Sequence, residues 1–456
     1  MVRKLDGRQH VEFRRFGRSA GLLSGGIGLA GLITYLYFAI ASHQLDADAY
    51  GEIVVLWSAT FVAVSMLYRP VEQLLSRTIA EREASGVYAG GAVRIAALIQ
   101  GVITLVWLLL AVLLREPLED GLLSGSSTLY WILVAAIAGY AANFLSRGFL
   151  AGRREFGLLS LLLLLEAGTR VFLAVLVAIG LGSGQTTLAI GVLLGPYVSL
   201  LVVPIALKKR PRVRSPGAQP RGRGELTLRH GSDFAASVFL IMAAEQVLLN
   251  GGPLLVQVSS GAAAAGFIFN VLMVARAPLL LFQGVAVSLL PHLTRLLSRA
   301  EEPSDVFAHS VRATLLLIAG FTVVACLTIL AAGPELMQVA FGDEFEYDRA
   351  GLLLVGFAIG PYLAATTLNQ AALAKGQVRR AAACWVAAAT LFIGWYLLGA
   401  LDELRRVEIG FAVSAVALAL MMYALYRVPG GRSEDVVRPG SPAEVEARLA
   451  AAEEAV

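Results

Sequence analysis

The chain has 456 residues, of which 57% are hydrophobic and 15% are charged, with a formal net charge of +4. Soluble domains average about 45–50% apolar and about 25% charged residues. The composition therefore excludes a soluble enzyme and a disordered scaffold, and it indicates a polytopic membrane protein. The basic residues gather in a few loops, which is a signal of membrane topology and not of a nucleic-acid partner.

Twelve apolar blocks are long enough to cross a bilayer, for which a helix needs about 20 mostly apolar residues. None of these blocks alternates in polarity as a transmembrane barrel strand would, so we predict an all-α fold with about twelve transmembrane helices. The predicted spans are 19–41, 52–68, 92–114, 128–148, 157–180, 187–207, 233–256, 263–290, 311–332, 350–372, 380–400 and 407–427.

Loop charge predicts the orientation of these spans. Of the 37 Lys and Arg residues, 31 fall in alternate loops and in the two end segments: 1–18, 69–94, 147–154, 208–229, 295–312, 375–380 and 427–456. Loops on the cytoplasmic side of a membrane carry an excess of Lys and Arg. We therefore predict that both termini are cytoplasmic, which requires an even number of spans.

A basic stretch rich in Pro and Gly, from Lys208 to Gly224, divides the sequence near its middle. Short patterns recur on either side of it at similar offsets: Pro70 and Pro291 are 221 residues apart, and the Leu-Ala pairs that begin at Leu150 and Leu373 are 223 residues apart. Such a repeat predicts two parallel six-helix lobes, as in many transporters, although a chance alignment of small residues is an alternative. The predicted units are an N-terminal segment (1–18), a first lobe (19–207), a linker (208–232), a second lobe (233–427) and a tail (428–456).

The sequence carries no motif of nucleotide or metal chemistry. The segment from Gly26 to Gly31 matches G-x-G-x-x-G but lies inside an apolar helix without the preceding strand that a dinucleotide site needs. No Walker loop is present, and the five histidines do not have the spacing of metal ligands. We expect no cofactor, no bound metal and no enzymatic activity.

Charged residues inside the predicted spans are the main candidates for a functional site. Glu166 and Arg170 are four residues apart on one face of a span, and Glu245 and Arg276 lie midway along two consecutive spans. A charge at that depth costs about 2.5–3.5 kcal/mol on insertion scales, so each must meet a partner or water. Two interpretations stay open: structural ion pairs Glu166–Arg170 and Glu245–Arg276, or a hydrated substrate cavity in which the arginines attract phosphate.

Two further sets of polar residues extend this hypothesis. Amide side chains close to the charged positions are suited to binding sugar hydroxyls, although each alone is more often an interhelical contact; they are Gln246, Asn250, Asn270, Asn369 and Gln370. At the cytoplasmic end of the second span, a polar cluster predicts either a cytoplasmic gate or an interfacial cap with snorkelling arginines; it contains Arg69, Glu72 and Arg77.

Several segments resemble the polysaccharide-biosynthesis flippases of the multidrug/oligosaccharidyl-lipid/polysaccharide (MOP) exporter superfamily, and the resemblance covers about residues 18–428. The segments are LDADAYGEIVVLW and PVEQLLSRTIAE at the second span, RGFLAGRREFG after the fourth, AEQVLLNGGPLLV in the seventh and ARAPLLLFQGVAVSLLPHLTRL through the eighth. The resemblance implies a V-shaped, MATE-like pair of six-helix bundles that works by alternating access.

The resemblance also implies a cargo and a location. The cargo would be an undecaprenyl-pyrophosphate-linked saccharide, moved from the cytoplasmic to the outer leaflet of a bacterial-type plasma membrane for surface polysaccharide synthesis. A cationic cavity would accommodate the pyrophosphate, and Arg170 and Arg276 are the positions suited to that role. The implied partners are the lipid bilayer, a coupling ion (proton or sodium) and the proteins of polysaccharide assembly.

Two other functions compete with this one. A cation-coupled multidrug exporter of the same superfamily would use Glu166 or Glu245 as its coupling carboxylate. A membrane polysaccharide polymerase or ligase would need a sizeable extracytoplasmic loop with catalytic Arg or His. The longest predicted outer loop, 333–349, contains one arginine and no histidine, which argues against the enzyme.

Overall fold

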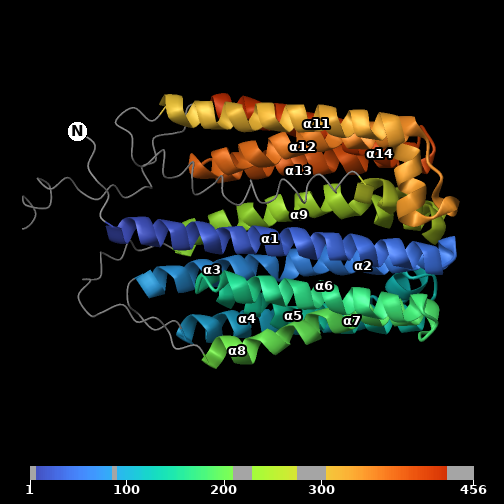
Figure 1. Ribbon diagram of the computed structural model, residues 1–456, viewed down its shortest axis with the longest axis horizontal. Coiled ribbons are helices and arrows are strands. Elements are labelled where there is room, and N and C mark those ends of the chain that lie inside the picture. The colour runs from blue at the N-terminus through green and yellow to red at the C-terminus, as the bar shows by residue number, and fades with distance from the viewer. Residues whose placement is uncertain (1–6, 85–89, 209–227, 275–303, 429–456) are drawn as a thin grey trace, which may run out of the picture.

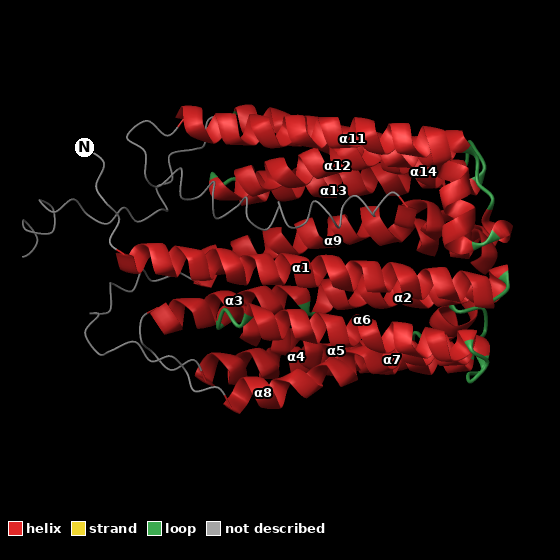
Figure 2. Ribbon diagram, in the orientation of Figure 1, coloured by secondary structure: helices red, strands yellow, loops and turns green. Residues whose placement is uncertain are grey.

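The computed structural model describes residues 7–84, 90–208, 228–274 and 304–428, and all regular structure within them is helical (Figure 2). The all-α prediction is therefore confirmed. The first half of the chain forms α1 (Gly7–Gln44), α2 (Ala47–Leu67), α3 (Arg69–Ala84), α4 (Gly90–Leu113), η1 (Pro117–Leu122), α5 (Ser127–Gly152), α6 (Phe156–Ala178), α7 (Gly184–Ser199), η2 (Leu200–Val202) and α8 (Val203–Lys208). The second half forms α9 (Leu228–Ser260), a helix at Ala262–Val274, α11 (Ser304–Phe341), η3 (Asp343–Phe345), α12 (Arg349–Ala374), α13 (Val378–Leu397) and α14 (Glu403–Arg427).

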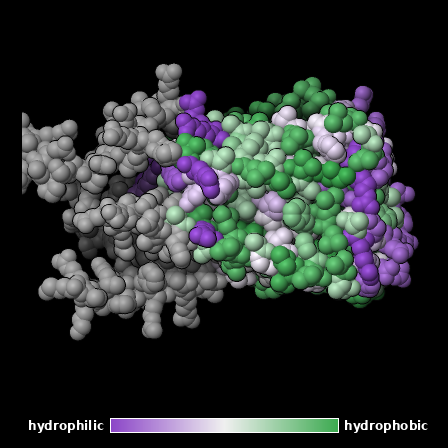
Figure 3. Space-filling view, turned by 90° about the horizontal axis from the view of Figure 1, so that it is seen from above, coloured by the Kyte–Doolittle hydropathy of each residue, from purple (hydrophilic) through white to green (hydrophobic). Residues whose placement is uncertain are grey.

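Eleven of the described helices are long and apolar enough to cross a membrane, and each matches one predicted span. The remaining predicted span, 263–290, begins as the helix Ala262–Val274, and its other residues lie outside the described part of the chain. The face shown in Figure 3 has the corresponding pattern, because a broad apolar belt covers it and ends at a hydrophilic rim. The chain is thus a multi-pass membrane protein.

Aspartates cap several helices at one end of the bundle, which we call the distal end (right in Figure 1). Asp46 Oδ1 accepts a hydrogen bond from the Ala49 N–H at 2.8 Å, and Asp402 Oδ1 accepts one from the Arg405 N–H at 3.1 Å. Asp348 caps α12 in the same way. A capping side chain satisfies an N–H group that has no partner within the helix, which defines where α2, α12 and α14 begin.

The helices form two groups, which we call the first lobe (α1–α8) and the second lobe (α9–α14). The two lobes lie side by side, and their helices run along the long axis of the molecule (Figure 1). Within the first lobe α1 packs along α6, and between the lobes α2 packs along α9. Helix α9 begins at Leu228, inside the predicted linker 208–232. Residues 209–227 of that linker, and the tail from 429 onward, lie outside the described residues.

At the distal end the lobes are closed against each other. The Tyr50 hydroxyl on α2 donates a hydrogen bond to Asn270 Oδ1, and Gly51 packs directly against the backbone of Ala262. Aromatic rings complete this distal seam, with centroids 4.6–5.5 Å apart in the pairs Phe38–Phe269, Tyr50–Phe345 and Tyr35–Phe341. The seam joins two lobes that are far apart in sequence.

Helix α3 is a difference from the sequence analysis, which treated residues 69–94 as a charged loop. The chain leaves α2 at Tyr68 and at once begins α3, with Pro70 in the first turn, where a missing N–H has no helical partner to lose. Glycines on α5 let α3 approach closely: a Cβ on Gly152 would lie 2.8 Å from the Ser76 carbonyl oxygen. A charged, amphipathic segment thus becomes part of the first lobe.

Candidate functional site

The carboxylate of Glu166, on α6, is the centre of a buried polar cluster in the first lobe. Its side chain is 3% exposed. It accepts hydrogen bonds from the Tyr140 hydroxyl at 3.0 Å, from Asn143 Nδ2 at 3.1 Å, from Arg147 Nη2 at 2.5 Å and from Arg170 Nη2 at 3.1 Å. One carboxylate therefore joins two guanidinium groups and two neutral donors, which we call the N-lobe cluster.

Helical periodicity places these donors around the carboxylate. Tyr140, Asn143 and Arg147 lie at i, i+3 and i+7 on α5, so they share one helix face. Arg170 lies one turn after Glu166 on α6, and its guanidinium carbon is 4.6 Å from the centroid of the Trp57 ring on α2. An arginine above an indole face is stabilised by the ring quadrupole, so α2 closes the cluster on its open side.

Glu245 forms an ion pair that connects the two lobes. Its Oε2 is 3.7 Å from Arg69 Nη1, at the start of α3, and its Oε1 accepts a hydrogen bond of 3.3 Å from the Tyr362 hydroxyl on α12. The two charged side chains are 26% and 40% exposed, respectively. The predicted partner Arg276 lies outside the described residues, and the structure gives Glu245 a partner from the other lobe instead.

Glu72 lies between this interlobe pair and the N-lobe cluster. Its carboxylate forms no ion pair within 4 Å with a described residue, and the charges of Arg147 and Arg69 act on it only from a longer distance. A tight helix contact brings it there, because a Cβ on Gly148 of α5 would lie only 2.8 Å from the Glu72 carbonyl oxygen. Six charged side chains of alternating sign are thus distributed from the second lobe to the core of the first, with ion pairs at the two ends of the series and none at Glu72 among the described residues. We call them the charge ladder: Glu245, Arg69, Glu72, Arg147, Glu166 and Arg170.

The sequence analysis identified five members of the charge ladder and missed Arg147, which it assigned to the loop 147–154. The signal that could have found this residue is the spacing of Tyr140, Asn143 and Arg147, which forms a polar stripe on an apolar helix. Arg77, predicted to be in the gate, lies outside the ladder: it pairs with Glu81 at 2.7 Å, and both side chains are 57% exposed.

Four of the five predicted sugar-binding amides make hydrogen bonds at separate places in the described structure. Gln246 and Asn250 bond to each other along α9 at 2.8 Å. Asn270 accepts from Tyr50 in the distal seam, and Asn369 accepts from Trp385 Nε1 at 3.2 Å within the second lobe. Three of these four amides thus make contacts within one lobe, and Asn270 makes a contact between the lobes.

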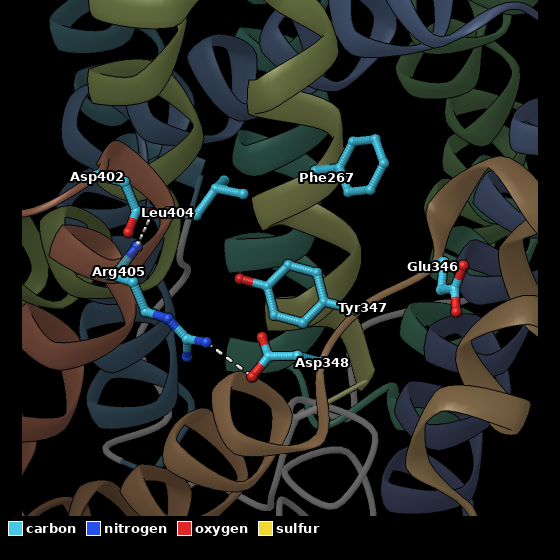
Figure 4. A pocket seen from close by; sticks show the side chains of 7 residues that line it. All are labelled: Phe267, Glu346, Tyr347, Asp348, Asp402, Leu404 and Arg405. Atoms are coloured by element: carbon cyan, nitrogen blue, oxygen red, sulfur yellow. Dashed lines mark hydrogen bonds and ion pairs between the residues drawn. The ribbon is translucent and has the colours of Figure 1, made fainter.

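A second polar site lies at the distal end of the second lobe (Figure 4). A pocket of about 340 Å³ is lined by Phe267, Glu346, Tyr347, Asp348, Asp402, Leu404 and Arg405. Arg405 Nη2 is 2.7 Å from Asp348 Oδ2, and its Nη1 is 2.8 Å from Oε2 of the fully buried Glu408. The Tyr347 hydroxyl also donates to Glu408.

These contacts join Tyr347 and Asp348, which precede α12, to Arg405 and Glu408 in the first turns of α14. Partial burial raises the pKa of Asp348, but hydrogen bonds from Arg405 and from the Gly351 N–H outweigh it and hold that pKa below its ordinary value. Burial and the neighbouring Glu408 carboxylate raise the pKa of Tyr347. The sequence analysis missed Glu408 because it lies at the edge of a predicted span, where a charge needs no explanation.

Within the described residues, no group of three or more His, Cys, Asp or Glu side chains could hold a metal ion.

Comparison with solved structures defines the class of fold. The chain is similar to a multidrug resistance MATE family transporter of the MOP superfamily in its inward-facing conformation, with a TM-score of 0.68 and 14% identity over 89% of this chain and 97% of that one. The outward-facing conformation gives a TM-score of 0.64, with 14% identity over 90% and 94%. A MOP superfamily transporter from Pyrococcus furiosus, described as having a binding pocket of reverse polarity, gives 0.63, with 15% identity over 90% and 94%. The chain thus has the fold of the MATE transporters.

Among proteins compared by sequence, the chain is similar to the uncharacterized protein Rv3630 of Mycobacterium tuberculosis. The two are 26% identical over 88% of this chain and 94% of that protein. The uncharacterized protein Mb3654 of Mycobacterium bovis is similar to the same extent. No family model matches the sequence.

Proposed function

We propose that this protein is a membrane transporter that works by alternating access between its two lobes, and that its cargo is a saccharide linked to undecaprenyl pyrophosphate. The charge ladder is the observation that carries this proposal. It supplies cationic side chains between the lobes and in the core of the first lobe, at positions where a membrane protein tolerates charge only for a structural or functional reason.

The hydrogen bonding of the carboxylates favours an anionic cargo over cation coupling. An ionised carboxylate offers about four lone-pair sites, and Glu166 already accepts four hydrogen bonds, two of them from arginines. Glu245 is likewise engaged, by Arg69 and Tyr362. A cation-coupled multidrug exporter needs a carboxylate that can release its partners to take up a proton or sodium. Glu166 is held by four partners, whereas the contact of Glu245 with Arg69 is longer, at 3.7 Å, and partly exposed.

Arg69 is the described arginine best placed to meet a pyrophosphate. Arg170 is 3% exposed, pairs with Glu166 and lies over the ring of Trp57. Arg69 lies between the lobes, is 40% exposed, and is separated from its carboxylate partner by 3.7 Å. The planar guanidinium can bond two phosphate oxygens at once, so we assign the first contact with the cargo to Arg69. Arg276, predicted for the same role, lies outside the described residues.

The proposed direction of transport follows from loop charge. The predicted cytoplasmic loops lie at the end opposite the distal seam, so the distal end faces the outer leaflet in this proposal. A seam closed at that end fits a conformation that accepts cargo from the cytoplasmic side. Transport to the outer leaflet then requires the seam between α2 and the helix Ala262–Val274 to part.

Flipping of a fluorescent undecaprenyl-pyrophosphate oligosaccharide in proteoliposomes tests this function, with and without an imposed pH gradient or potential. Arg69→Ala is expected to reduce flipping more than tenfold, and Arg69→Lys is expected to restore it in part, because lysine keeps the charge but loses the bidentate geometry. Arg77→Ala is the matched control on the same helix, outside the ladder. Equal flipping by Arg69→Ala and wild-type protein would remove Arg69 from the mechanism. An absence of flipping together with gradient-driven uptake of a cationic dye would support the multidrug exporter.

A further inference from the structure

Arg69 and Glu245 carry opposite charges across the lobe interface without a hydrogen bond between them. Arg69 Nη1 is 3.7 Å from Glu245 Oε2, which is beyond hydrogen-bonding distance, and the two side chains are 40% and 26% exposed, respectively. In the core of the first lobe, by contrast, Glu166 accepts four hydrogen bonds and is 3% exposed. Of these two sites, the interlobe pair is therefore the one that a ligand can separate.

The carboxylate of Glu245 is held from its own lobe and can accept further hydrogen bonds. An ionised carboxylate offers about four lone-pair sites, and among the described residues the one hydrogen bond to Glu245 comes from the Tyr362 hydroxyl, at 3.3 Å from Oε1. The Tyr362 ring is 2% exposed, with its centroid 6.0 Å from that of Trp385 and 6.2 Å from that of Phe411. A rigid ring thus orients the carboxylate, while Oε2, the oxygen nearest Arg69, keeps acceptor capacity.

A phosphate group bound at Arg69 brings the atoms next to it close to Glu245. A guanidinium bonds two phosphate oxygens at once, and Glu245 Oε2 lies 3.7 Å from the same guanidinium. In a sugar 1-phosphate, the carbon beside the phosphate-bearing carbon carries a hydroxyl or an acetamido group, and both donate hydrogen bonds. Such a ligand can replace the interlobe ion pair by two contacts, phosphate with Arg69 and sugar donor with Glu245.

We propose that Glu245 is a specificity-determining residue that recognises the sugar attached to the phosphate, and that Tyr362 is the residue that positions it. The recognised sugar is a neutral one, with a hydroxyl or acetamido donor beside the phosphate. A uronic acid is disfavoured, because it brings a second carboxylate into a partly buried site that already holds one, and like charges there repel. The inference rests on the proposed function, since Arg69 must hold the phosphate.

Isothermal titration calorimetry of the purified full-length protein tests this with three probes: methyl phosphate, glucose 1-phosphate and glucuronic acid 1-phosphate. We expect the wild type to bind glucose 1-phosphate about three- to tenfold more tightly than methyl phosphate, as for a hydrogen bond to a charged group in a partly exposed site. Glucuronic acid 1-phosphate should bind at least about threefold more weakly than glucose 1-phosphate. Arg69→Ala should abolish the binding of all three probes.

Glu245→Gln separates recognition of the sugar from damage to the fold, because it changes two quantities in opposite directions. Without the competing carboxylate, Arg69 should bind methyl phosphate as tightly as before or up to about fivefold more tightly. The preference for glucose 1-phosphate over methyl phosphate should nevertheless fall to about twofold or less, and the discrimination against glucuronic acid 1-phosphate should disappear. Glu81→Gln, which changes an exposed arginine-paired carboxylate on the same helix as Arg69, is the control and should change neither quantity.

Tyr362→Phe tests the positioning role. Phenylalanine keeps the ring beside Trp385 and Phe411 but removes the hydroxyl that donates to Glu245. The preference for glucose 1-phosphate should fall by about half or more, and the affinity for methyl phosphate should stay within about twofold of the wild type.

A preference for glucose 1-phosphate that persists in Glu245→Gln would overturn the inference, and so would equal binding of glucose 1-phosphate and methyl phosphate by the wild type. In both cases, phosphate binding that depends on Arg69 leaves the proposed function in place. Parallel loss of all affinities in Glu245→Gln also overturns the inference, since it assigns Glu245 a structural role. If no probe binds the wild type, the phosphate site at Arg69 is refuted together with the inference, and the flipping assay alone decides the proposed function.

Discussion

The close contact of Gly51 with Ala262 between the lobes makes a direct test of alternating access possible. A Cβ atom added to Gly51 would lie 1.8 Å from the Ala262 carbonyl oxygen and 2.2 Å from its carbonyl carbon. Ordinary contact begins at 3.4 Å, so the Cβ falls about 1.6 Å short of it against backbone that cannot rotate away. Gly51→Val should therefore force the distal seam apart.

Overpacking of this kind costs about 1–3 kcal/mol. If the strain acts only on the closed seam, it shifts the equilibrium toward the open distal end by about five- to a hundredfold, since 1.4 kcal/mol corresponds to a factor of ten. Ala265, which is fully buried close to the seam, can report this. In a protein whose Cys326 and Cys384 are replaced by alanine, Ala265→Cys should react with a maleimide several-fold faster when Gly51 is valine. Detergent-solubilised protein makes the assay independent of orientation.

The control is Gly168→Val on α6, where an added Cβ meets nothing within 4 Å. It changes the same residue type in a helix of the same lobe and should leave the labelling rate unaltered. If Gly51→Val folds and Ala265→Cys stays as unreactive as in the parent, the seam does not close through this contact, and the proposed outer gate is wrong.

Three other predictions concern stability. Glu166→Gln leaves two arginines without their carboxylate partner and should lower the unfolding free energy by about 3–5 kcal/mol; an unchanged melting temperature in detergent would contradict the ion-pair cluster. Glu408→Gln removes the carboxylate shared by Tyr347 and Arg405 and should lower the free energy of unfolding by about 1–3 kcal/mol. Chemical denaturation of the protein in detergent measures this difference. Because the pKa of Asp348 lies below its ordinary value of 3.8, its contact with Arg405 should stabilise the protein above that pH and cease to do so as the pH falls through the lowered value. Asp348→Asn should therefore reduce the loss of melting temperature between pH 7 and pH 3, and an equal loss in both proteins would refute this.

The spans could be predicted from the sequence because the length of an apolar block alone decides whether a helix crosses a bilayer. Helix α3 was missed because its charged residues and Pro70 resemble a loop. The signal that could have found it is the spacing of Val71, Leu75 and Ile79, every fourth residue, and all three side chains are buried in the structure.

In the candidate site, too, a contact within one helix could be predicted from the sequence, whereas a contact between helices could not. The i, i+4 spacing of Glu166 and Arg170 is a property of one helix, and the structure places the two side chains 3.1 Å apart. The partner of Glu245 depends on which helices meet across the lobes. Adjacency in sequence suggested Arg276, whereas the packing of α2 and α3 near α9 provides Arg69.

The N-lobe cluster also has a consequence for how the protein is assembled. Synthesis produces α5 before α6, so Arg147 exists for a time without the carboxylate that later binds it. Such a side chain near a helix end reaches toward the interface until it is neutralised. Helix α6, in contrast, carries Glu166 and Arg170 together and enters the bilayer with its own counter-ion. The arrival of α6 therefore both neutralises Arg147 and draws it inward, which makes the α5–α6 hairpin the step that fixes the first lobe during biogenesis.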